Sequence, residues 1–385
     1  MKRKICVVVN SRANYGRIKS AMLEIRKHSK LSLQLILGAS ALLDRFGDIR
    51  KNLKADGFVA DAEIHTIIEG ENPTTMAKST GLAIIELATC FENLKPDIVV
   101  TVADRFETLA TAVAASYMNI PLAHTQGGES TGSIDESVRH AITKLAHIHF
   151  PASKRSEQTL HLLGEKKDTV FLVGCPSIDL LPKKIKKPNR EFFKKYSGVG
   201  TTIEPDLPYF VVLQHPVTTE FGSGANQIQQ TLKAVQKFNV QTVWLWPNID
   251  AGSDQISKEL RKFRENNPKS PFHFYKNFKA EDYYRLIEHA SCLIGNSSSA
   301  LREGAYLGVP AVNIGTRQKN REHGPNVVNV DYNWKKIYKA IQKQVKHGTY
   351  PSNKIFGNAD AGKKIALILA KVKPKIQKNL TYFKT

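Results

Sequence analysis

The sequence predicts an α/β protein in which two domains each carry a parallel sheet covered by helices. Its length of 385 residues suits two domains of about 150 to 200 residues. Short apolar runs of strand length alternate with stretches in which apolar residues recur at helical spacing. The alternation occurs twice along the chain. Strands separated by helices form right-handed βαβ units, so both sheets are expected to be parallel.

The first series of elements predicts a domain over residues 1–174. A turn over 10–16 opens a helix that places Ile18, Met22 and Ile25 on one face. Gly164 is expected to end another helix. Further helices are expected over 76–93, after the charged residues 104–107, from about residue 133, and over 153–163. The expected strands are 5–9, 33–37, 64–67, 98–102, 121–124 and 169–173.

Residues 175–207 are expected to link the domains, because Pro, Lys and Gly accumulate there. A second domain is predicted over 208–360, with helices over 281–289 and 300–307. Its strands are expected at 209–213, 242–245, 272–275, 292–294 and 310–314, the last of which closes the sheet. The remaining residues, 361–385, contain a helical stretch over 362–378 that is placed to pack back across the cleft.

The formal net charge of +21 raises the question of a polyanionic partner. The basic residues are spread along the chain, with concentrations over 182–187, 334–346 and 362–378 where lysines alternate with apolar residues at helical spacing. We interpret these segments as solvated helix faces and expect no nucleic-acid partner, although a polyanion-binding surface stays open as the alternative. A positive field would also attract a small anionic substrate.

The apolar runs are far shorter than the roughly 20 residues that cross a bilayer, so no membrane segment is expected. The run after Met1-Lys2-Arg3-Lys4 stops at Asn10, which is too short for a signal peptide, and we expect a cytoplasmic protein. Four cysteines lie far apart without a Cys-x-x-Cys pair. The sequence therefore predicts neither disulfides nor a metal site, and no cofactor.

Polar residues gather where strands of the first domain end. Asp104 and Arg105 follow the strand 98–102, and Gln126, Glu129 and Asp135 follow the strand 121–124. Because the carboxyl ends of parallel strands meet at one crevice, these side chains are expected to converge where such folds bind ligands.

Structural roles remain open for several of these side chains. Asp104 would equally form an ion pair with Arg105 or cap a helix. Ser133 and Glu136 have the spacing of a capping box, in which Asp135 would favour the helix dipole. Arg139 lies one turn further on and would contact either ligand or core.

The second domain supplies an anion-binding pattern. Residues 295–299 (GNSSS) stand between a strand and a helix, where backbone N–H groups and hydroxyls attract a phosphate. Glu303 would accept two ribose hydroxyls, or form an exposed pair with Arg302. Arg12 and Arg317, at strand ends of the two sheets, are fork donors suited to a diphosphate. His215 would donate to or protonate a leaving phosphate, or serve a structural role.

Six short motifs resemble the hydrolysing UDP-N-acetylglucosamine 2-epimerases of sialic-acid biosynthesis. The resemblance extends from 11–16 (SRANYG) to 313–318 (NIGTRQ). The motifs are 104–107 (DRFE), 127–135 (GGESTGSID), 139–144 (RHAITK), 214–219 (QHPVTT), 247–252 (PNIDAG) and 295–298 (GNSS).

This resemblance implies a GT-B architecture, with two Rossmann-like domains facing across a cleft and UDP held by the second. It implies a UDP-sugar substrate, a homodimer and no nucleic-acid or membrane partner. Asp104 and Asp135 match the acidic catalytic positions of the family, and Phe278 and Tyr283 the segment around uracil. The expected nucleotide and substrate contacts are Arg12, Arg105, Glu129, Arg139, His215, Asn248, Asp250, Ser297, Ser298, Glu303 and Arg317.

The implied reaction eliminates UDP from UDP-GlcNAc to give a 2-acetamidoglucal, which takes up water and leaves as N-acetylmannosamine with C2 inverted. Two carboxyl groups around one sugar ring suit this proton chemistry. Gln126 departs from the acidic residue that many relatives carry at this catalytic position, and an amide cannot exchange a proton at neutral pH. The other carboxyls then do this work, or the substrate differs.

Four alternatives stay open. An enzyme of legionaminic-acid synthesis would perform the same bond chemistry on UDP-N,N'-diacetylbacillosamine. A non-hydrolysing epimerase would return UDP-N-acetylmannosamine, and a GT-B glycosyltransferase would need an acceptor. A UDP-sugar-binding protein without catalytic activity is the non-enzyme alternative.

Overall fold

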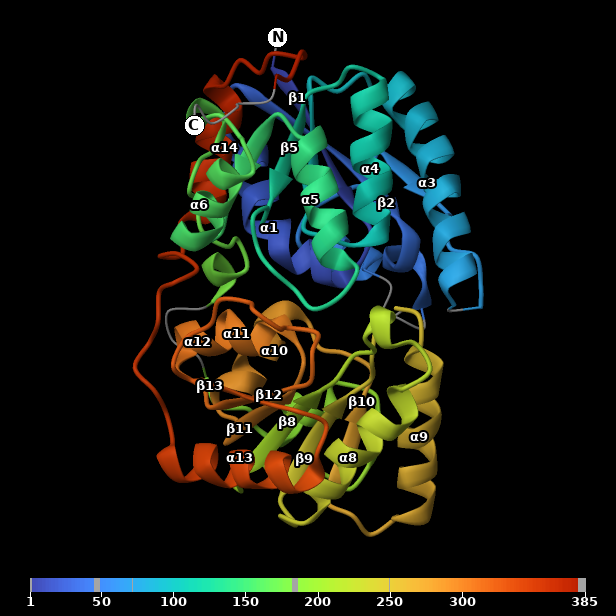
Figure 1. Cartoon of the computed structure of the whole chain (residues 1–385), viewed down its shortest axis with the longest axis vertical. Coiled ribbons are helices and arrows are strands. Elements are labelled where there is room, and N and C mark those ends of the chain that lie inside the picture. The colour runs from blue at the N-terminus through green and yellow to red at the C-terminus, as the bar shows by residue number, and fades with distance from the viewer. Residues whose placement is uncertain (1, 45–48, 71, 182–185, 249, 380–385) are drawn as a thin grey trace.

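The computed structural model describes residues 2–44, 49–70, 72–181, 186–248 and 250–379. Two α/β units lie one above the other along the long axis of the molecule, each with a central sheet between helices (Figure 1). All strand pairs of the first sheet are parallel, and in the second sheet only the edge pair β7–β10 is antiparallel. The predicted class, with two Rossmann-like domains, is confirmed.

The first sheet has the strand order β3-β2-β1-β4-β5-β6. Its strands are β1 (Arg3–Val9), β2 (Leu31–Gly38), β3 (Ala62–Ile64), β4 (Ile98–Val102), β5 (Leu122–Thr125) and β6 (Ile148–Phe150). Its helices are α1 (Arg12–Lys27), α2 (Arg50–Ala55), α3 (Pro73–Leu94), α4 (Phe106–Tyr117), α5 (Asp135–Leu145) and α6 (Lys154–Leu162). Every residue of β4 is buried, as expected for a strand covered on both faces.

Three predictions for this domain are corrected. The strand expected at 64–67 is β3, which ends at Ile64. The strand expected at 169–173 is absent from the described residues: a 3-10 helix (Lys167–Thr169) stands there, with one isolated bridge from Val170 to His149. Pairing cannot extend along this edge because Pro151, after β6, has no N–H to donate.

The capping box at Ser133 is the third correction. The helix α5 begins at Asp135, and its N-cap residue Ile134 makes no side-chain capping bond. The Glu136 carboxylate instead accepts the N–H of Thr131 at 2.8 Å. The glutamate therefore fixes the loop that leads to the helix.

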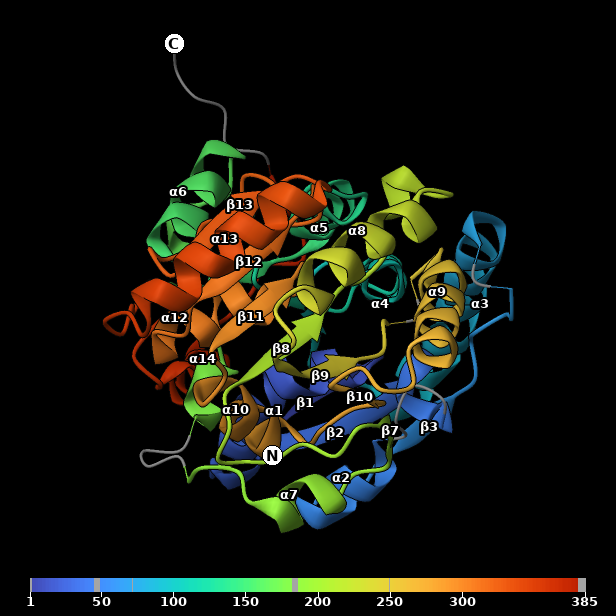
Figure 2. The same ribbon diagram turned by 90° about the horizontal axis from the view of Figure 1, so that it is seen from below.

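The second sheet has the order β13-β12-β11-β8-β9-β10-β7. Its strands are β7 (Gly198–Gly200), β8 (Tyr209–Leu213), β9 (Gln241–Leu245), β10 (Phe272–Tyr275), β11 (Cys292–Gly295), β12 (Ala311–Ile314) and β13 (Val327–Val330). Its helices include α7 (Arg190–Lys194), α8 (Gly224–Gln236), α9 (Ser253–Asn266), α10 (Ala280–Glu288), α11 (Ser298–Leu301), α12 (Glu303–Leu307) and α13 (Trp334–His347). Figure 2 shows α8, α9 and α13 over this sheet.

Two predictions here are corrected. The strand β12 does not close the sheet, because β13 pairs with its outer edge. The helix expected over 300–307 is two short helices with a break at Arg302, whose guanidinium reaches Glu129 of the first domain. The segment 175–207, expected as a linker, also contains α7 and the strand β7, which pairs antiparallel with β10.

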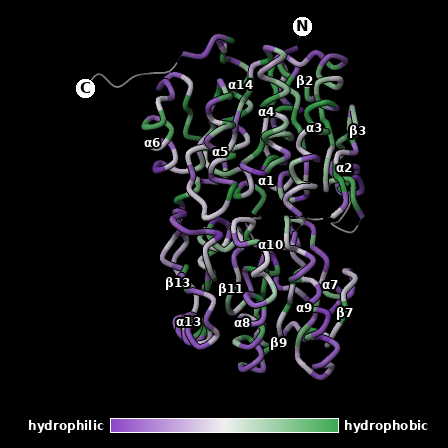
Figure 3. Tube along the Cα trace, turned by 45° about the vertical axis from the view of Figure 1, so that its right-hand side comes forward, coloured by the Kyte–Doolittle hydropathy of each residue, from purple (hydrophilic) through white to green (hydrophobic). Residues whose placement is uncertain are grey.

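The C-terminal helix α14 (Ala361–Lys371) returns to the first domain and lies against α1. Its residues Ile365, Ala366 and Leu369 belong to the same apolar core as β1 and α1. The lysines of α13 are exposed and its buried residues face the sheet, and Figure 3 colours this helix as largely hydrophilic. Of the basic segment 182–187, residues 182–185 lie outside the described part.

Candidate active site

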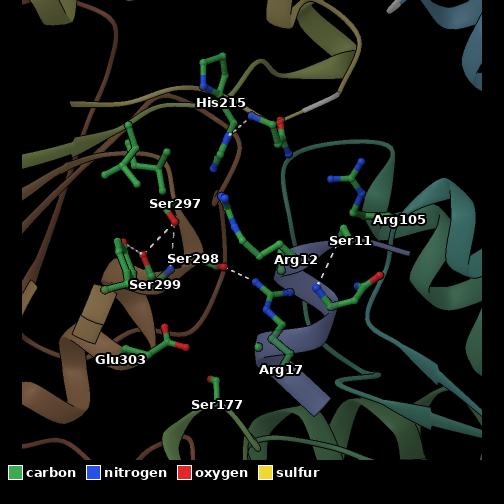
Figure 4. Close-up of a pocket in the computed structure, with 18 of the residues that line it drawn as sticks. Ser11, Arg12, Arg17, Arg105, Ser177, His215, Ser297, Ser298, Ser299 and Glu303 are labelled. Atoms are coloured by element: carbon green, nitrogen blue, oxygen red, sulfur yellow. Dashed lines mark hydrogen bonds between the residues drawn. The ribbon is translucent and has the colours of Figure 1, made fainter. Parts of the chain in front are cut away.

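One cavity of about 270 Å³ opens between the two domains at the carboxyl ends of both sheets. Figure 4 shows α1 entering it from the first domain, opposite the serines that follow β11. The cationic side chains that line it are Arg12, Arg17, Lys276, Arg105, Arg317 and Arg321. The carboxyl side chains that line it are Asp104, Asp135 and Glu303. This excess of positive charge suits a diphosphate.

The first two turns of α1 place two arginines in the cavity. Ser11 caps the helix by accepting the N–H of Asn14 at 3.1 Å, which fixes the side chains that follow. Arg12 extends toward His215 and Ser297, and Arg17 donates to the Ser298 hydroxyl (Figure 4).

Burial makes both arginines of α1 receptive to an anion. It lowers the pKa of Arg12 to about 10, and burial together with Arg302 and Arg321 lowers the pKa of Arg17 to about 10. Both side chains remain charged at neutral pH. A bound anion would offset the cost of keeping these charges out of water.

Asp104, directly after β4, lines the cavity and forms an ion pair with Arg139 of α5. Arg139 is fully buried and also donates to the backbone carbonyl of Glu129 at 2.5 Å. The predicted pair of Asp104 with Arg105 is therefore replaced by a pair with Arg139. Arg139 itself is not among the residues that line the cavity.

Asp135 opens α5 and is the second carboxyl group from the first domain. Burial and the nearby charge of Asp250 raise its pKa, against the opposing effect of Arg317 and Arg105. A carboxyl group with a raised pKa is suited to holding and delivering a proton. Asp104, paired with Arg139, and Asp135, near another carboxylate, thus stand in opposite electrostatic environments.

His215 lines the cavity on the side of the second domain. Its Nδ1 accepts the backbone N–H of Asn248 at 3.1 Å, so a neutral ring carries its proton on Nε2. Burial, with Arg317, lowers its pKa to about 3. Of the two roles expected for His215, hydrogen-bond donation to a phosphate is favoured over protonation of it, because a neutral ring donates a hydrogen bond but has no extra proton to transfer at neutral pH.

The turn after β11 forms the wall opposite α1. Gly295 has φ of +124°, and a Cβ there would lie 2.2 Å from the carbonyl oxygen of Leu213, so the turn requires glycine. Ser297 caps α11 by accepting the N–H of Ser299 at 3.3 Å. Ser297, Ser298 and Glu303 all line the cavity.

Phe278 and Tyr283 close the end of the cavity near β9 and β10, together with Leu245, Trp246 and Lys276. The hydroxyl of Tyr283 lies 2.7 Å from that of Ser299, which joins this end to the serine turn. A flat apolar base would find contacts here.

Three other predicted residues are absent from the cavity lining: Gln126, Glu129 and Asp250. Gln126 is buried with φ of +62°, accepts from Arg17 at 3.4 Å and approaches the Cys175 sulfur at 3.4 Å. Glu129 forms buried ion pairs with Arg302 and Arg321 of the second domain. Asn248, by contrast, lines the cavity and donates to Asp250 at 2.6 Å; its neighbour Ile249 lies outside the described residues.

Sequence reasoning missed several lining residues, among them Ser40, Arg17, Ser177, Lys276, Gln318 and Arg321. Arg17 lies five residues beyond Arg12, which is about 1.4 turns of a helix, so no same-face spacing pointed to it. Arg321 had no such signal, since it follows β12 in an irregular segment. Among the described residues, no group of His, Cys, Asp and Glu side chains is arranged to hold a metal ion.

Two Rossmann-like domains with a cationic cavity at their strand ends define a class of proteins that bind nucleotide-linked anions. The chain belongs to the UDP-N-acetylglucosamine 2-epimerase family, which it matches over residues 23–370.

Two relatives are 30% identical to this chain. One is the UDP-N-acetylglucosamine 2-epimerase of Neisseria meningitidis serogroup B, with 94% of this chain and 92% of the relative covered. The other is the UDP-N,N'-diacetylbacillosamine 2-epimerase (hydrolyzing) of Legionella pneumophila, with 96% of each covered.

Solved structures share the fold. The UDP-GlcNAc 2-epimerase from Neisseria meningitidis bound to UDP-GlcNAc matches with a TM-score of 0.76 at 20% identity, over 96% of this chain and 100% of that one. The enzyme from Methanocaldococcus jannaschii in complex with UDP-GlcNAc and UDP matches with a TM-score of 0.78 at 17% identity, over 95% and 99%. The expected GT-B architecture is thus confirmed. Among the described residues, no helix is long and apolar enough to cross a membrane.

Proposed function

We propose that this protein is a hydrolysing UDP-GlcNAc 2-epimerase. It converts UDP-GlcNAc and water into UDP and N-acetylmannosamine. One observation carries the proposal: a single cavity has arginines and hydroxyls suited to a diphosphate, and two carboxyl groups of the first domain, Asp104 and Asp135. The relatives named as hydrolysing enzymes support this branch of the family.

The first step breaks the C1–O bond to UDP and removes the C2 proton, giving a 2-acetamidoglucal. The C2 proton is weakly acidic, so departure of the diphosphate must run ahead of proton removal. Arg12, Arg17 and the neutral ring of His215 donate to the negative charge that develops on the leaving phosphate. Asp104, which forms an ion pair with Arg139, takes the proton.

The second step adds the hydroxyl of water to C1 and a proton to C2. Inversion requires the proton to arrive on the face opposite to the one it left. Two acids on different elements suit this requirement, since Asp104 follows β4 and Asp135 opens α5. Asp135, whose pKa is raised, delivers the proton to C2 and takes back the proton that water gives up as it adds to C1. Asp104 releases to solvent the proton that it took in the first step.

Gln126 has no part in proton transfer in this scheme. Its amide oxygen accepts from Arg17, so it helps to orient a guanidinium toward the diphosphate. The substitution of an amide for an acid at this position is then compatible with turnover.

UDP-N,N'-diacetylbacillosamine is the second candidate substrate. The relative from Legionella pneumophila that is named for it is as similar, at 30% identity, as the Neisseria relative named for UDP-GlcNAc. The elimination and hydration are the same for both sugars, which differ at C4 and C6.

Incubation of the purified protein with each UDP-sugar, followed by chromatography of nucleotides and sugars, tests the proposal. We expect free UDP and N-acetylmannosamine from UDP-GlcNAc, with the larger kcat/KM for this substrate. A UDP-linked epimer as the final product would contradict the hydrolysing reaction. A larger kcat/KM for the bacillosamine nucleotide would transfer the assignment to the second candidate.

A further inference from the structure

We propose that Asp250 is a positioning residue: it ties the two domains together behind the diphosphate site and places a negative charge near Asp135. Asp250 lies on the segment after β9 and is buried, yet it is not part of the cavity lining. It therefore acts through other side chains. The inference rests on the proposed function and deepens it.

Three donors converge on this carboxylate. Oδ1 lies 3.1 Å from Nη2 of Arg105, which belongs to the first domain. Oδ2 lies 3.4 Å from Nη2 of Arg317 in the second domain, and accepts from the Asn248 amide at 2.6 Å. Arg105 and Arg317 both line the cavity, so one buried anion holds two cavity arginines that come from opposite domains.

Arg105 is fixed from its other side as well. Its Nε donates to Glu107 at 3.1 Å, and Nη2 lies 3.1 Å from the other carboxylate oxygen of Glu107. Glu107 belongs to the first domain, and Asp250 is a partner of Arg105 from the second. The orientation of Arg105 therefore depends on a contact between the two domains.

The charge of Asp250 also acts on the proposed proton donor, Asp135. The charged groups around Asp135 are Asp250, Arg317 and Arg105. Asp250 opposes ionisation of Asp135, and the two arginines favour it. Arg105 and Arg317 in turn hold the pKa of Asp250 below its ordinary value, so that Asp250 keeps its charge. The negative charge that raises the pKa of Asp135 is thus supplied by the second domain.

The test is Asp250→Asn, measured by calorimetric binding of UDP and by the pH profile of turnover. We expect binding of UDP to weaken about tenfold, the effect of losing a charge-assisted contact to the arginines. The limb of the pH profile that reports Asp135 should move to lower pH, because a like charge near this carboxyl group has been removed. Asp250→Glu should restore the limb.

The matched control is Asp254→Asn, an exposed aspartate in the first turn of α9, which should change neither measurement. A purely structural Asp250 would lower thermal stability and leave the pH limb in place, and that result would overturn the proposal. So would unchanged binding of UDP. Binding of UDP is measured without turnover. A wild-type protein that binds UDP but converts neither UDP-sugar would therefore contradict the proposed function, while the effect of Asp250→Asn on UDP binding would still test the positioning role.

Discussion

The two walls of the cavity differ in their chemistry. The first domain contributes Asp104 and Asp135, each controlled by neighbouring charges. The second contributes the neutral His215 and the hydroxyls of Ser297 and Ser298. The carboxyl groups of the first domain are proposed to move protons, whereas the second domain contributes donors for an anion, together with Arg12 and Arg17 of α1. Substitution of a carboxyl group should therefore separate catalysis from nucleotide binding.

The two walls are also built differently. The carboxyl groups depend on buried arginines such as Arg139, which is fully excluded from solvent. The anion-binding wall depends on a backbone turn at Gly295 that no other residue fits. Side-chain substitutions on the first wall should therefore change rate without changing the fold of the second.

The largest expected effect is that of Asp104→Asn. It removes the proposed base, so kcat should fall by about 10²- to 10⁴-fold. UDP should bind within about twofold of wild type, because Asp104 is not among the groups proposed to contact the nucleotide. Steady-state kinetics and calorimetry measure the two quantities. The control is Asp168→Asn, an exposed residue of the same domain, and an active Asp104→Asn enzyme would remove this residue from the mechanism.

The next effect is that of His215→Phe, which removes the Nε2 donor while keeping a ring. We expect kcat to fall by about 10²- to 10³-fold, as for loss of a donor to a developing oxyanion. Because the pKa of His215 is lowered to about 3, the wild-type profile should show no histidine limb near pH 6.5. A limb at that pH that vanished in the variant would contradict the neutral ring.

A smaller effect on kcat/KM is expected from a substitution that keeps the two domains apart. The N–H of Gly132 in the first domain donates to the carbonyl of Arg317 in the second at 3.1 Å, and a Cβ on Gly132 would lie 1.8 Å from the carbonyl oxygen of Thr316. Gly132→Ala should lower kcat/KM about tenfold by opposing closure. Small-angle scattering with UDP should give a larger radius of gyration than wild type. Gly81→Ala, where the added atom meets nothing within 4 Å, is the control.

The smallest effect on turnover is expected for Glu129→Gln, since Glu129 is not part of the cavity lining. Its buried pairs with Arg302 and Arg321 should instead contribute about 3 kcal/mol to stability. Arg302 and Arg321 lower the pKa of Glu129 to about 2, so this contribution is present above pH 4.5 and is lost as pH falls toward 2. The stability of the Glu129→Gln variant should not show this loss between pH 4.5 and 2. An acid unfolding transition identical to that of the wild-type protein would contradict the prediction.

Most of the fold could be predicted because the sequences of buried parallel strands are unbroken apolar runs. The strand β4 is an example, and its predicted limits equal the observed ones. The strand β6 was missed because His149 makes it look polar, whereas that histidine is buried beside Glu165 at 3.0 Å. Arg302 also appeared to be a surface residue, because its partner Glu129 lies 173 positions away in the chain and the sequence does not reveal the pair.

Site residues at strand ends could be predicted, because the carboxyl edge of a parallel sheet is fixed by topology. Asp104 and His215 are examples, and both line the cavity. The protonation of His215 could not be predicted, because it depends on burial and on the arginines of both domains. The separate roles of Asp135 and Asp250 depend in the same way on contacts across the cleft.

The most direct test of the whole account is turnover of UDP-GlcNAc in deuterated water, with the products examined by proton NMR. We expect N-acetylmannosamine carrying deuterium at C2, together with free UDP. An N-acetylmannosamine that retained the substrate hydrogen at C2, or a substrate recovered intact, would contradict elimination by Asp104 and hydration through Asp135.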